Sequence, residues 1–290
     1  MKIRKAVIPA AGWGTRFLPL TKSQPKEMLP LLNKPVIQYI LEEAVACGIE
    51  LVIMVTSLRK RGIEEHFDRC FELEDFLRQR GETGLAEDIC HLANLVEVCY
   101  VHQKQQLGLG HAVLTAQNVV GNEPFILFLP DDLLEYGERE MKQMLDIHKQ
   151  YESTVLAVKR VARQEVSRYG IIASRKIADR IYQVTDLVEK PVPSEAPSNL
   201  AIIGRYVLMP QIFGLLQNTP PNKNNEIQLT DALHQTLEHQ PIYAYEFEGK
   251  CYDLGTPFGW LEAQVEFALR DPDIAPKFRD YLKKKLRDIT

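Results

Sequence analysis

The stretch VIPAAGWGTRFLP, residues 7–19, combines two features that determine how the fold is predicted. It begins in a β-branched, apolar run of strand length, which then gives way to alanines and glycines before a single arginine, Arg16. In an open parallel sheet, ligands bind at the carboxyl ends of the strands, where such turns lie. The stretch therefore predicts a strand that ends at a ligand-binding edge of an α/β sheet.

The rest of the first half alternates between strand and helix patterns. Apolar residues recur with helical spacing over 35–48, 60–77, 108–120 and 137–151. Continuous apolar runs of strand length occupy 49–55, 96–101, 124–130 and 153–161. This order is typical of a mostly parallel sheet with helices on both faces.

The second half is less regular but still alternates. Paired strands are expected at 168–174 and 180–190, and a further strand at 199–210. Helices are expected at 210–217, 228–239 and 257–269, with short strands at 242–247 and 250–255. No repeat or linker composition divides the chain, so we expect one domain over 1–290 with a nucleotide-binding half near 1–135 and a second half over about 136–290.

Composition excludes several classes of partner. A net charge of -4 offers no general attraction for nucleic acid or an anionic membrane. The five cysteines include no C-x-x-C pair, which favours reduced thiols, and no apolar run is long enough to cross a bilayer. We therefore expect a cytoplasmic protein with no nucleic-acid or membrane partner.

The glycine-rich loop and the segment after it carry the positive charge of the predicted site. A loop of small residues lets backbone N–H groups approach a phosphate or a base edge, and the guanidinium of Arg16 matches phosphate geometry. Lys26 lies in TKSQPKEMLPLLNKP, residues 21–35, where prolines are expected to keep the chain extended and aim the lysine over the loop. A plain glycine turn beside a solvated lysine loop is the alternative. Phe17 breaks the G-x-G-x-x-G dinucleotide pattern, and no G-x-x-x-x-G-K-[ST] motif is present.

Carboxylates follow two of the predicted strands. Asp131 and Asp132 end the buried run over 124–130, and Asp253 ends a second strand-like run. Carboxylates at the end of a strand are natural ligands for a hard cation such as Mg²⁺, and two of them from distant segments can hold one ion. A turn or helix-capping role is the alternative for each.

Two other pairs of residues suit small-molecule binding. The amide of Gln103, close to Gly108, can both donate and accept, which matches the imide edge of uracil or thymine. Glu189 and Lys190 end a strand and offer an acceptor for sugar hydroxyls and a charge for phosphate. A surface glutamine and an exposed ion pair are the alternatives. The histidines fit no metal or triad pattern, and His111 is expected on the side of a helix.

Nearly the whole chain, from residue 7 to about 270, resembles the bacterial UTP–glucose-1-phosphate uridylyltransferases. The resemblance rests on these motifs: PAAGWGTRFLPLTKSQPKEMLP, KPVIQYILEEAVACGI, HFDRCFELEDFL, LGLGHAV, LPDD, VEKP, APSNLAIIGRYVL, NEIQLTDAL and YDLGTPFGW. It implies a Rossmann-like nucleotidyltransferase fold with a mixed, mostly parallel central sheet flanked by helices. It also implies that glucose 1-phosphate attacks the α-phosphorus of UTP, with Mg²⁺, to give UDP-glucose and pyrophosphate, and that the enzyme is a homodimer or homotetramer.

The resemblance also assigns roles by motif. The catalytic residues would be Arg16, Lys26 and Asp131, and the metal would be held by Asp131 and Asp253. The nucleotide would contact Ala10, Ala11, Gly12, Gly14, Thr15, Glu27, Gln103 and Gly108, the last three around uracil. The sugar phosphate would contact Asp132, Gly170, Glu189 and Lys190.

Departures from the usual pattern leave fine specificity open. Leu107 stands where a lysine is common, residues 222–231 lack a glycine-containing turn, and Ser57 with Leu58 replaces a more polar pair. The same chemistry with dTTP or another hexose 1-phosphate is one alternative. A sugar-transferring enzyme that consumes a nucleotide sugar is another, although the sequence lacks D-x-D at 131–133. A regulatory protein without activity is a third, although the GTR motif and Lys26 are intact.

Overall fold

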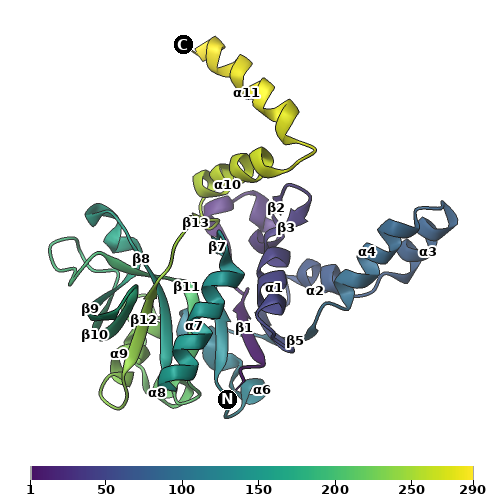
Figure 1. The fold of residues 1–290 in the computed structure, drawn as a ribbon. Coiled ribbons are helices and arrows are strands. Elements are labelled where there is room, and N and C mark those ends of the chain that lie inside the picture. Colours follow the sequence, from purple (N-terminus) through teal and green to yellow (C-terminus); the bar gives the residue numbers. More distant parts are fainter. Residues whose placement is uncertain (1, 290) are drawn as a thin grey trace.

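The computed structural model describes residues 2–289, with side chains through residue 287, and a nine-stranded sheet forms its centre (Figure 1). The strands are β1 (Lys5–Pro9), β4 (Leu51–Thr56), β5 (Glu97–His102), β6 (Phe125–Phe128), β8 (Thr154–Arg160), β9 (Gly170–Ala178), β10 (Ile181–Glu189), β11 (Leu200–Leu208) and β12 (Ile242–Glu246). Their order across the sheet is β5-β4-β1-β6-β11-β8-β12-β10-β9. β1 therefore lies inside the sheet, with parallel partners on both sides.

Strand directions confirm the prediction of a mixed sheet, in which only β10 and β11 run opposite to the other seven strands. β5, β4, β1 and β6 pair in parallel, as do β8 and β12. β11 runs antiparallel to β6 and β8, and β10 runs antiparallel to β12 and β9. Because β11 is central, all nine of its residues are buried, including the charged Arg205.

Helices cover both faces of the sheet, as the alternating pattern predicts. On one face, α1 (Val36–Ala46) and α7 (Gly137–Tyr151) share a core with Ala6 and Ile8 of β1. On the other face, α5 (Gly108–Thr115), α8 (Ile212–Asn218) and α9 (Leu229–Thr236) share a core with Val7. A strand places successive side chains on opposite faces, so β1 contributes to both cores.

The prediction of one helix over 60–77 is wrong in one respect, because the structure has two helices there with a break between them. α2 (Arg61–Phe67) ends where Asp68 adopts an extended conformation, and α3 (Phe71–Gln79) begins after it. α3 pairs with α4 (Thr83–Ala93) in a hairpin that projects beyond the β5 edge (Figure 1). The hairpin leaves Phe71 and Phe76 more than half exposed, although both continue the apolar periodicity of the sequence. Only the tertiary structure reveals the break between α2 and α3.

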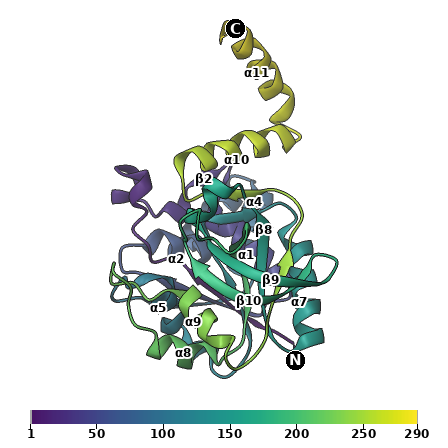
Figure 2. The ribbon, with the colours of Figure 1, turned by 90° about the vertical axis from the view of Figure 1, so that its left-hand side faces the viewer.

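A second small sheet brings two distant segments to the end of the large sheet. β13 (Cys251–Asp253) pairs antiparallel with β7 (Asp132–Leu134), which sets Asp253 opposite Asp132. β13 leads into α10 (Pro257–Arg270), and α11 (Ala275–Ile289) extends away from the body (Figures 1 and 2). No helix within residues 2–289 is both long and apolar enough to span a bilayer.

Short elements complete the fold around the glycine-rich loop. The segment expected to be extended by its prolines instead contains single 3₁₀ turns; Pro25 itself has an extended ψ of 134°, and the turn begins at the next residue, Lys26. These elements are η1 (Thr15–Phe17), η2 (Leu20–Lys22), η3 (Lys26–Met28), the hairpin of β2 (Pro30–Leu31) and β3 (Lys34–Pro35), and, further along the chain, α6 (Gln117–Val120) and η4 (Arg163–Arg168).

Candidate active site

Two adjoining cavities lie at the carboxyl ends of the central strands. The first, which we call the glycine-loop cavity, has a volume of about 490 Å³ and is lined by residues 11–15, Lys26, Glu27, Gln103 and Gly108, among others. The second, the strand-end cavity, has a volume of about 590 Å³. Of the predicted residues, it is lined by Arg16, Asp131, Asp132, Gly170, Glu189, Lys190 and Asp253. Asp131 lines both cavities, so the two sets of predicted residues meet at its carboxylate.

The glycine-rich loop turns sharply enough to bring Lys26 beside it. Gly14 has a φ of 65°, which favours glycine, and the Thr21 hydroxyl donates to its carbonyl oxygen at 2.8 Å. A Cβ at Gly14 would lie 3.1 Å from the Thr21 side chain and 3.2 Å from Cβ of Lys26. The absence of a side chain at this position therefore lets the lysine pack against the turn.

Lys26 neutralises the carboxylate at the junction of the cavities. Its ammonium group donates to both carboxylate oxygens of Asp131. Burial alone would lower the pKa of Lys26, but the carboxylates of Asp131 and Glu27 outweigh burial and raise this pKa above its usual value. Lys26 is therefore positively charged at neutral pH and could neutralise an anionic ligand in the glycine-loop cavity.

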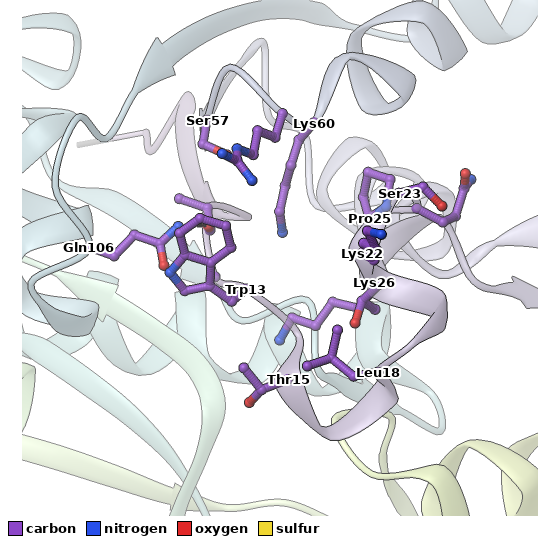
Figure 3. A pocket seen from close by; sticks show the side chains of 15 residues that line it. Trp13, Thr15, Leu18, Lys22, Ser23, Pro25, Lys26, Ser57, Lys60 and Gln106 are labelled. Atoms are coloured by element: carbon purple, nitrogen blue, oxygen red, sulfur yellow. Dashed lines mark hydrogen bonds between the residues drawn. The ribbon is translucent and has the colours of Figure 1, made fainter.

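A buried ion pair that the sequence did not predict lies behind Lys26. Both oxygens of Glu27 accept from the ammonium of Lys60, at 2.7 and 2.8 Å, and both residues are almost fully buried. Burial raises the pKa of Glu27, and Lys60 and then Lys26 oppose that rise. Figure 3 shows Lys60 and Lys26 extending into a smaller pocket of about 260 Å³ beside the loop, which also contains Trp13. We call it the lysine pocket.

The opposite wall of the glycine-loop cavity holds Gln103. The backbone N–H of Gln103 donates to Thr56 at 2.9 Å, which continues the pairing of β5 with β4. Gly108 has a φ of 89°, and a Cβ there would lie 2.9 Å from Cβ of Glu226. Only glycine fits this approach, and Glu226 thereby becomes part of the wall. The motif NEIQLTDAL contains Glu226, but no role in the site was predicted for this residue from the sequence.

Two carboxylates and one arginine that line the strand-end cavity converge on Gly255. A Cβ at Gly255 would lie 3.1 Å from Asp253 Oδ1, 3.2 Å from Asp131 Oδ2 and 3.3 Å from Arg16 Nη1. The guanidinium of Arg16 also donates to the Gly255 carbonyl oxygen at 3.4 Å. The pairing of β13 with β7 creates this convergence, because it sets Asp253 opposite Asp132, the residue that follows Asp131.

This pair of carboxylates suits a magnesium ion. Mg²⁺ is usually bound by one or two carboxylates, with waters and substrate phosphates as the remaining ligands. Over residues 2–287, no group of three or more His, Cys, Asp or Glu side chains is arranged to hold a metal by itself. Asp131 and Asp253 could hold such an ion if substrate and water supplied its remaining ligands.

The far end of the strand-end cavity combines hydrogen-bonding groups with a close backbone. Glu189 accepts from the Thr230 hydroxyl at 2.6 Å and pairs with Lys190 at 3.0 Å. A Cβ at Gly170 would lie 3.1 Å from the Thr230 hydroxyl oxygen and 3.2 Å from Glu189 Oε2. Burial raises the pKa of Asp132 to about 6, and its carboxylate accepts from the backbone N–H of Gly204 at 3.1 Å. This end offers carboxylates and a hydroxyl that can form hydrogen bonds with a polyhydroxylated ligand.

The structure separates one predicted residue from the rest and adds others. Ala10 is fully buried and its N–H donates to Val55, so that N–H is not available to a nucleotide. Arg168, which lines the strand-end cavity, pairs with Asp253, and Gln106 donates to the Ala11 carbonyl at 2.7 Å. Neither belongs to a motif that spacing alone would select.

Comparison with known proteins gives a consistent result. Residues 5–269 match the family model described as nucleotidyl transferase. A UTP–glucose-1-phosphate uridylyltransferase of Staphylococcus epidermidis is 47% identical over 98% of this chain and 98% of the relative. The UTP–glucose-1-phosphate uridylyltransferase YngB of Bacillus subtilis is 46% identical over 100% of this chain and 97% of the relative.

Solved structures agree with the sequence relatives. A UTP-bound UDP-glucose pyrophosphorylase from Acinetobacter baumannii superposes with a TM-score of 0.90 at 39% identity, covering 97% of this chain and 98% of the other. A UDP-glucose pyrophosphorylase in complex with UDP-glucose gives a TM-score of 0.84 at 44% identity, covering 93% of this chain and 100% of the other.

Proposed function

This chain belongs to the nucleotidyl transferase family, and on that premise we propose that it transfers the uridylyl group of UTP to α-D-glucose 1-phosphate. The products are UDP-glucose and pyrophosphate. One observation carries the proposal: Asp131 lines both cavities, Lys26 pairs with it, and the Arg16 guanidinium approaches the same glycine, Gly255, as its carboxylate. Two anionic substrates, one in each cavity, can therefore meet beside two fixed cations.

The chemistry requires charge neutralisation more than proton transfer. A phosphate oxygen of glucose 1-phosphate forms a bond to the α-phosphorus of UTP, and the bond from that phosphorus to the pyrophosphate oxygen breaks. The nucleophile is already an anion, so no general base is needed. The barrier lies in bringing two anions together, and positioned cations reduce it.

Each side chain of the junction has a defined part in this step. Lys26 and Arg16 offset the charge of the phosphates as negative charge moves to the leaving pyrophosphate. Asp131 and Asp253 would hold Mg²⁺, which supplies further neutralisation of the phosphate oxygens when bound. The ion pair of Lys26 with Asp131 keeps both groups at the junction of the cavities, where we place the reacting phosphorus.

The division of the two cavities along the chain suggests which substrate each one binds. The glycine-loop cavity is lined mainly by residues from the first half of the chain, and we assign it to UTP, with Glu27, Gln103 and Gly108 around uracil. The strand-end cavity is lined mainly by residues from the second half, and we assign it to glucose 1-phosphate, with Asp132, Gly170, Glu189 and Lys190 as its contacts. The chain thus forms one domain with a nucleotide half near 1–135 and a sugar-phosphate half over 136–290.

We also assign the enzyme to the cytoplasm and to a homodimer or homotetramer. The C-terminal helices support the oligomer, since Phe258 and Leu261 of α10 and Tyr281 of α11 are each more than half exposed. Light scattering of the purified protein tests this assignment, and a monomer at micromolar concentration would contradict it.

Turnover with each component omitted in turn tests the function. We expect release of pyrophosphate and UDP-glucose only when UTP, glucose 1-phosphate and Mg²⁺ are all present. Parallel assays with dTTP and with other hexose 1-phosphates establish the specificity. Pyrophosphate release without glucose 1-phosphate, or no release with all three, would overturn the proposal.

A further inference from the structure

The amide of Gln103 is held in one orientation by two neighbours. Its nitrogen lies 2.8 Å from Nδ1 of His111 and 3.3 Å from the carbonyl oxygen of Gly108. A backbone carbonyl oxygen can only accept, so the side of the amide that faces Gly108 must be the nitrogen. Both N–H groups of Gln103 are therefore directed at protein acceptors, and its carbonyl oxygen is left for a ligand.

The same geometry specifies the protonation of His111. Nδ1 must accept the hydrogen bond from Gln103, so the ring proton lies on Nε2. Burial lowers the pKa of His111 below its usual value, which keeps the imidazole neutral at pH 7. Gln103 itself is only 6% exposed, so bulk water does not compete for its amide.

We propose that His111 is a positioning residue that holds the carbonyl oxygen of Gln103 toward the nucleobase, so that the enzyme selects an imide-bearing base. The inference rests on the proposed function, which places uracil against Gln103. Uracil presents an N3–H donor between two carbonyl acceptors, whereas cytosine presents an N3 acceptor beside an amino group. A carbonyl oxygen fixed toward the base accepts from N3–H of uracil and repels N3 of cytosine. Rotation of the amide by 180° would reverse that preference.

A second residue on α5 allows the positioning role of His111 to be tested separately from any effect on the helix itself. Thr115, one turn further along, donates its hydroxyl to the backbone carbonyl of His111 at 2.8 Å, so it contacts the same turn of the helix and makes no hydrogen bond to Gln103 among the described residues. Within the described residues, the imidazole makes its hydrogen bond to Gln103 alone. Changes at His111 and Thr115 therefore perturb the same helix, but only the first changes the orientation of the amide.

Nucleotide selectivity of three variants tests the proposal. We expect His111→Ala to lower the ratio of kcat/KM for UTP to that for CTP at least tenfold, through the KM for the nucleotide and not that for glucose 1-phosphate. His111→Asn should restore most of the ratio, because its amide oxygen accepts near the position of Nδ1. Thr115→Ala should keep the ratio within twofold of wild type. Equal losses with UTP and CTP in His111→Ala, at an unchanged melting temperature, would overturn the positioning role.

A spectroscopic measurement tests His111 independently of the reaction. Nitrogen-15 NMR of the full-length protein at pH 7.5 should show His111 as the neutral tautomer with a proton on Nε2 and none on Nδ1. A proton on Nδ1 would overturn the inference even if the enzyme uses UTP. A wild-type enzyme with no UTP turnover would overturn the proposed function. The position of the ring proton is measured without turnover, so failure of the His111 proposal and failure of the proposed function can be told apart.

Discussion

Replacement of Lys26 by methionine removes one charge at the junction of the cavities and preserves most of the side-chain volume. The Lys26 ammonium contacts both oxygens of Asp131, and the two side chains are 17% and 37% exposed. The pair is therefore intermediate between a surface ion pair, which contributes up to about 1 kcal/mol, and a buried one, whose disruption costs about 3–5 kcal/mol. We expect Lys26→Met to lower the free energy of unfolding by about 1–2 kcal/mol, because Asp131 keeps part of its hydration.

The effect on the reaction should exceed the effect on folding. Loss of one fixed electrostatic donor at a reacting centre raises the barrier by about 2–4 kcal/mol. That range corresponds to a decrease of about 30- to 900-fold in kcat/KM. The folded fraction remains high after a loss of 1–2 kcal/mol from a typical domain, so reduced folding does not account for the decrease.

Pyrophosphate release under matched folded concentrations measures this prediction. Lys34→Met is the control, because Lys34 lies in the same segment and forms a partly exposed pair with Glu42 at 2.9 Å, away from both cavities. We expect Lys34→Met to keep kcat/KM within about twofold of wild type. A Lys26→Met enzyme with wild-type kcat/KM would refute the assignment of charge neutralisation to Lys26.

Three other variants test separate parts of the account. Gly255→Ala would set a methyl group within 3.1–3.2 Å of the two proposed metal carboxylates, so we expect a several-fold higher Mg²⁺ requirement in rate titrations. Gly214→Ala is the control, because a Cβ there meets no atom within 4 Å, and it should keep the wild-type requirement. An equal Mg²⁺ requirement in both variants would contradict the metal site. Gln103→Ala should raise the KM for UTP more than the KM for glucose 1-phosphate, and equal increases would argue against base recognition. Arg205→Met removes a fully buried guanidinium that donates to Glu43 at 2.6 and 2.7 Å, so denaturant unfolding should show a loss of about 3–5 kcal/mol; a loss below 1 kcal/mol would contradict the ion pair.

The parts of the fold that depend on neighbouring residues could be predicted from the sequence. The strand that ends at Pro9, the helix that begins at Val36 and the strand from Leu51 follow from local apolar periodicity and a nearby glycine. The break at Asp68 could not be predicted, because α3 continues the periodicity while packing mainly on α4 instead of on the sheet. The pairing of β13 with β7 joins segments more than 100 residues apart, which no local pattern specifies.

The site shows the same division between local and distant information. Arg16 and Lys26 lie in one short segment, so composition and turn chemistry indicated them together. Lys60 was missed because it precedes an amphipathic helix, and its partner Glu27 is 33 residues away. The wall formed by Glu226 depends on the positive φ of Gly108, and only the tertiary structure shows which segment a glycine approaches.

A crystal structure of this chain with bound UDP-glucose tests the central claim most directly. The account predicts that the diphosphate lies at the junction of the two cavities, within hydrogen-bonding distance of Arg16 or Lys26, with uracil against Gln103 and glucose beside Glu189. A diphosphate bound in the lysine pocket beside Trp13, or outside both cavities, would contradict it.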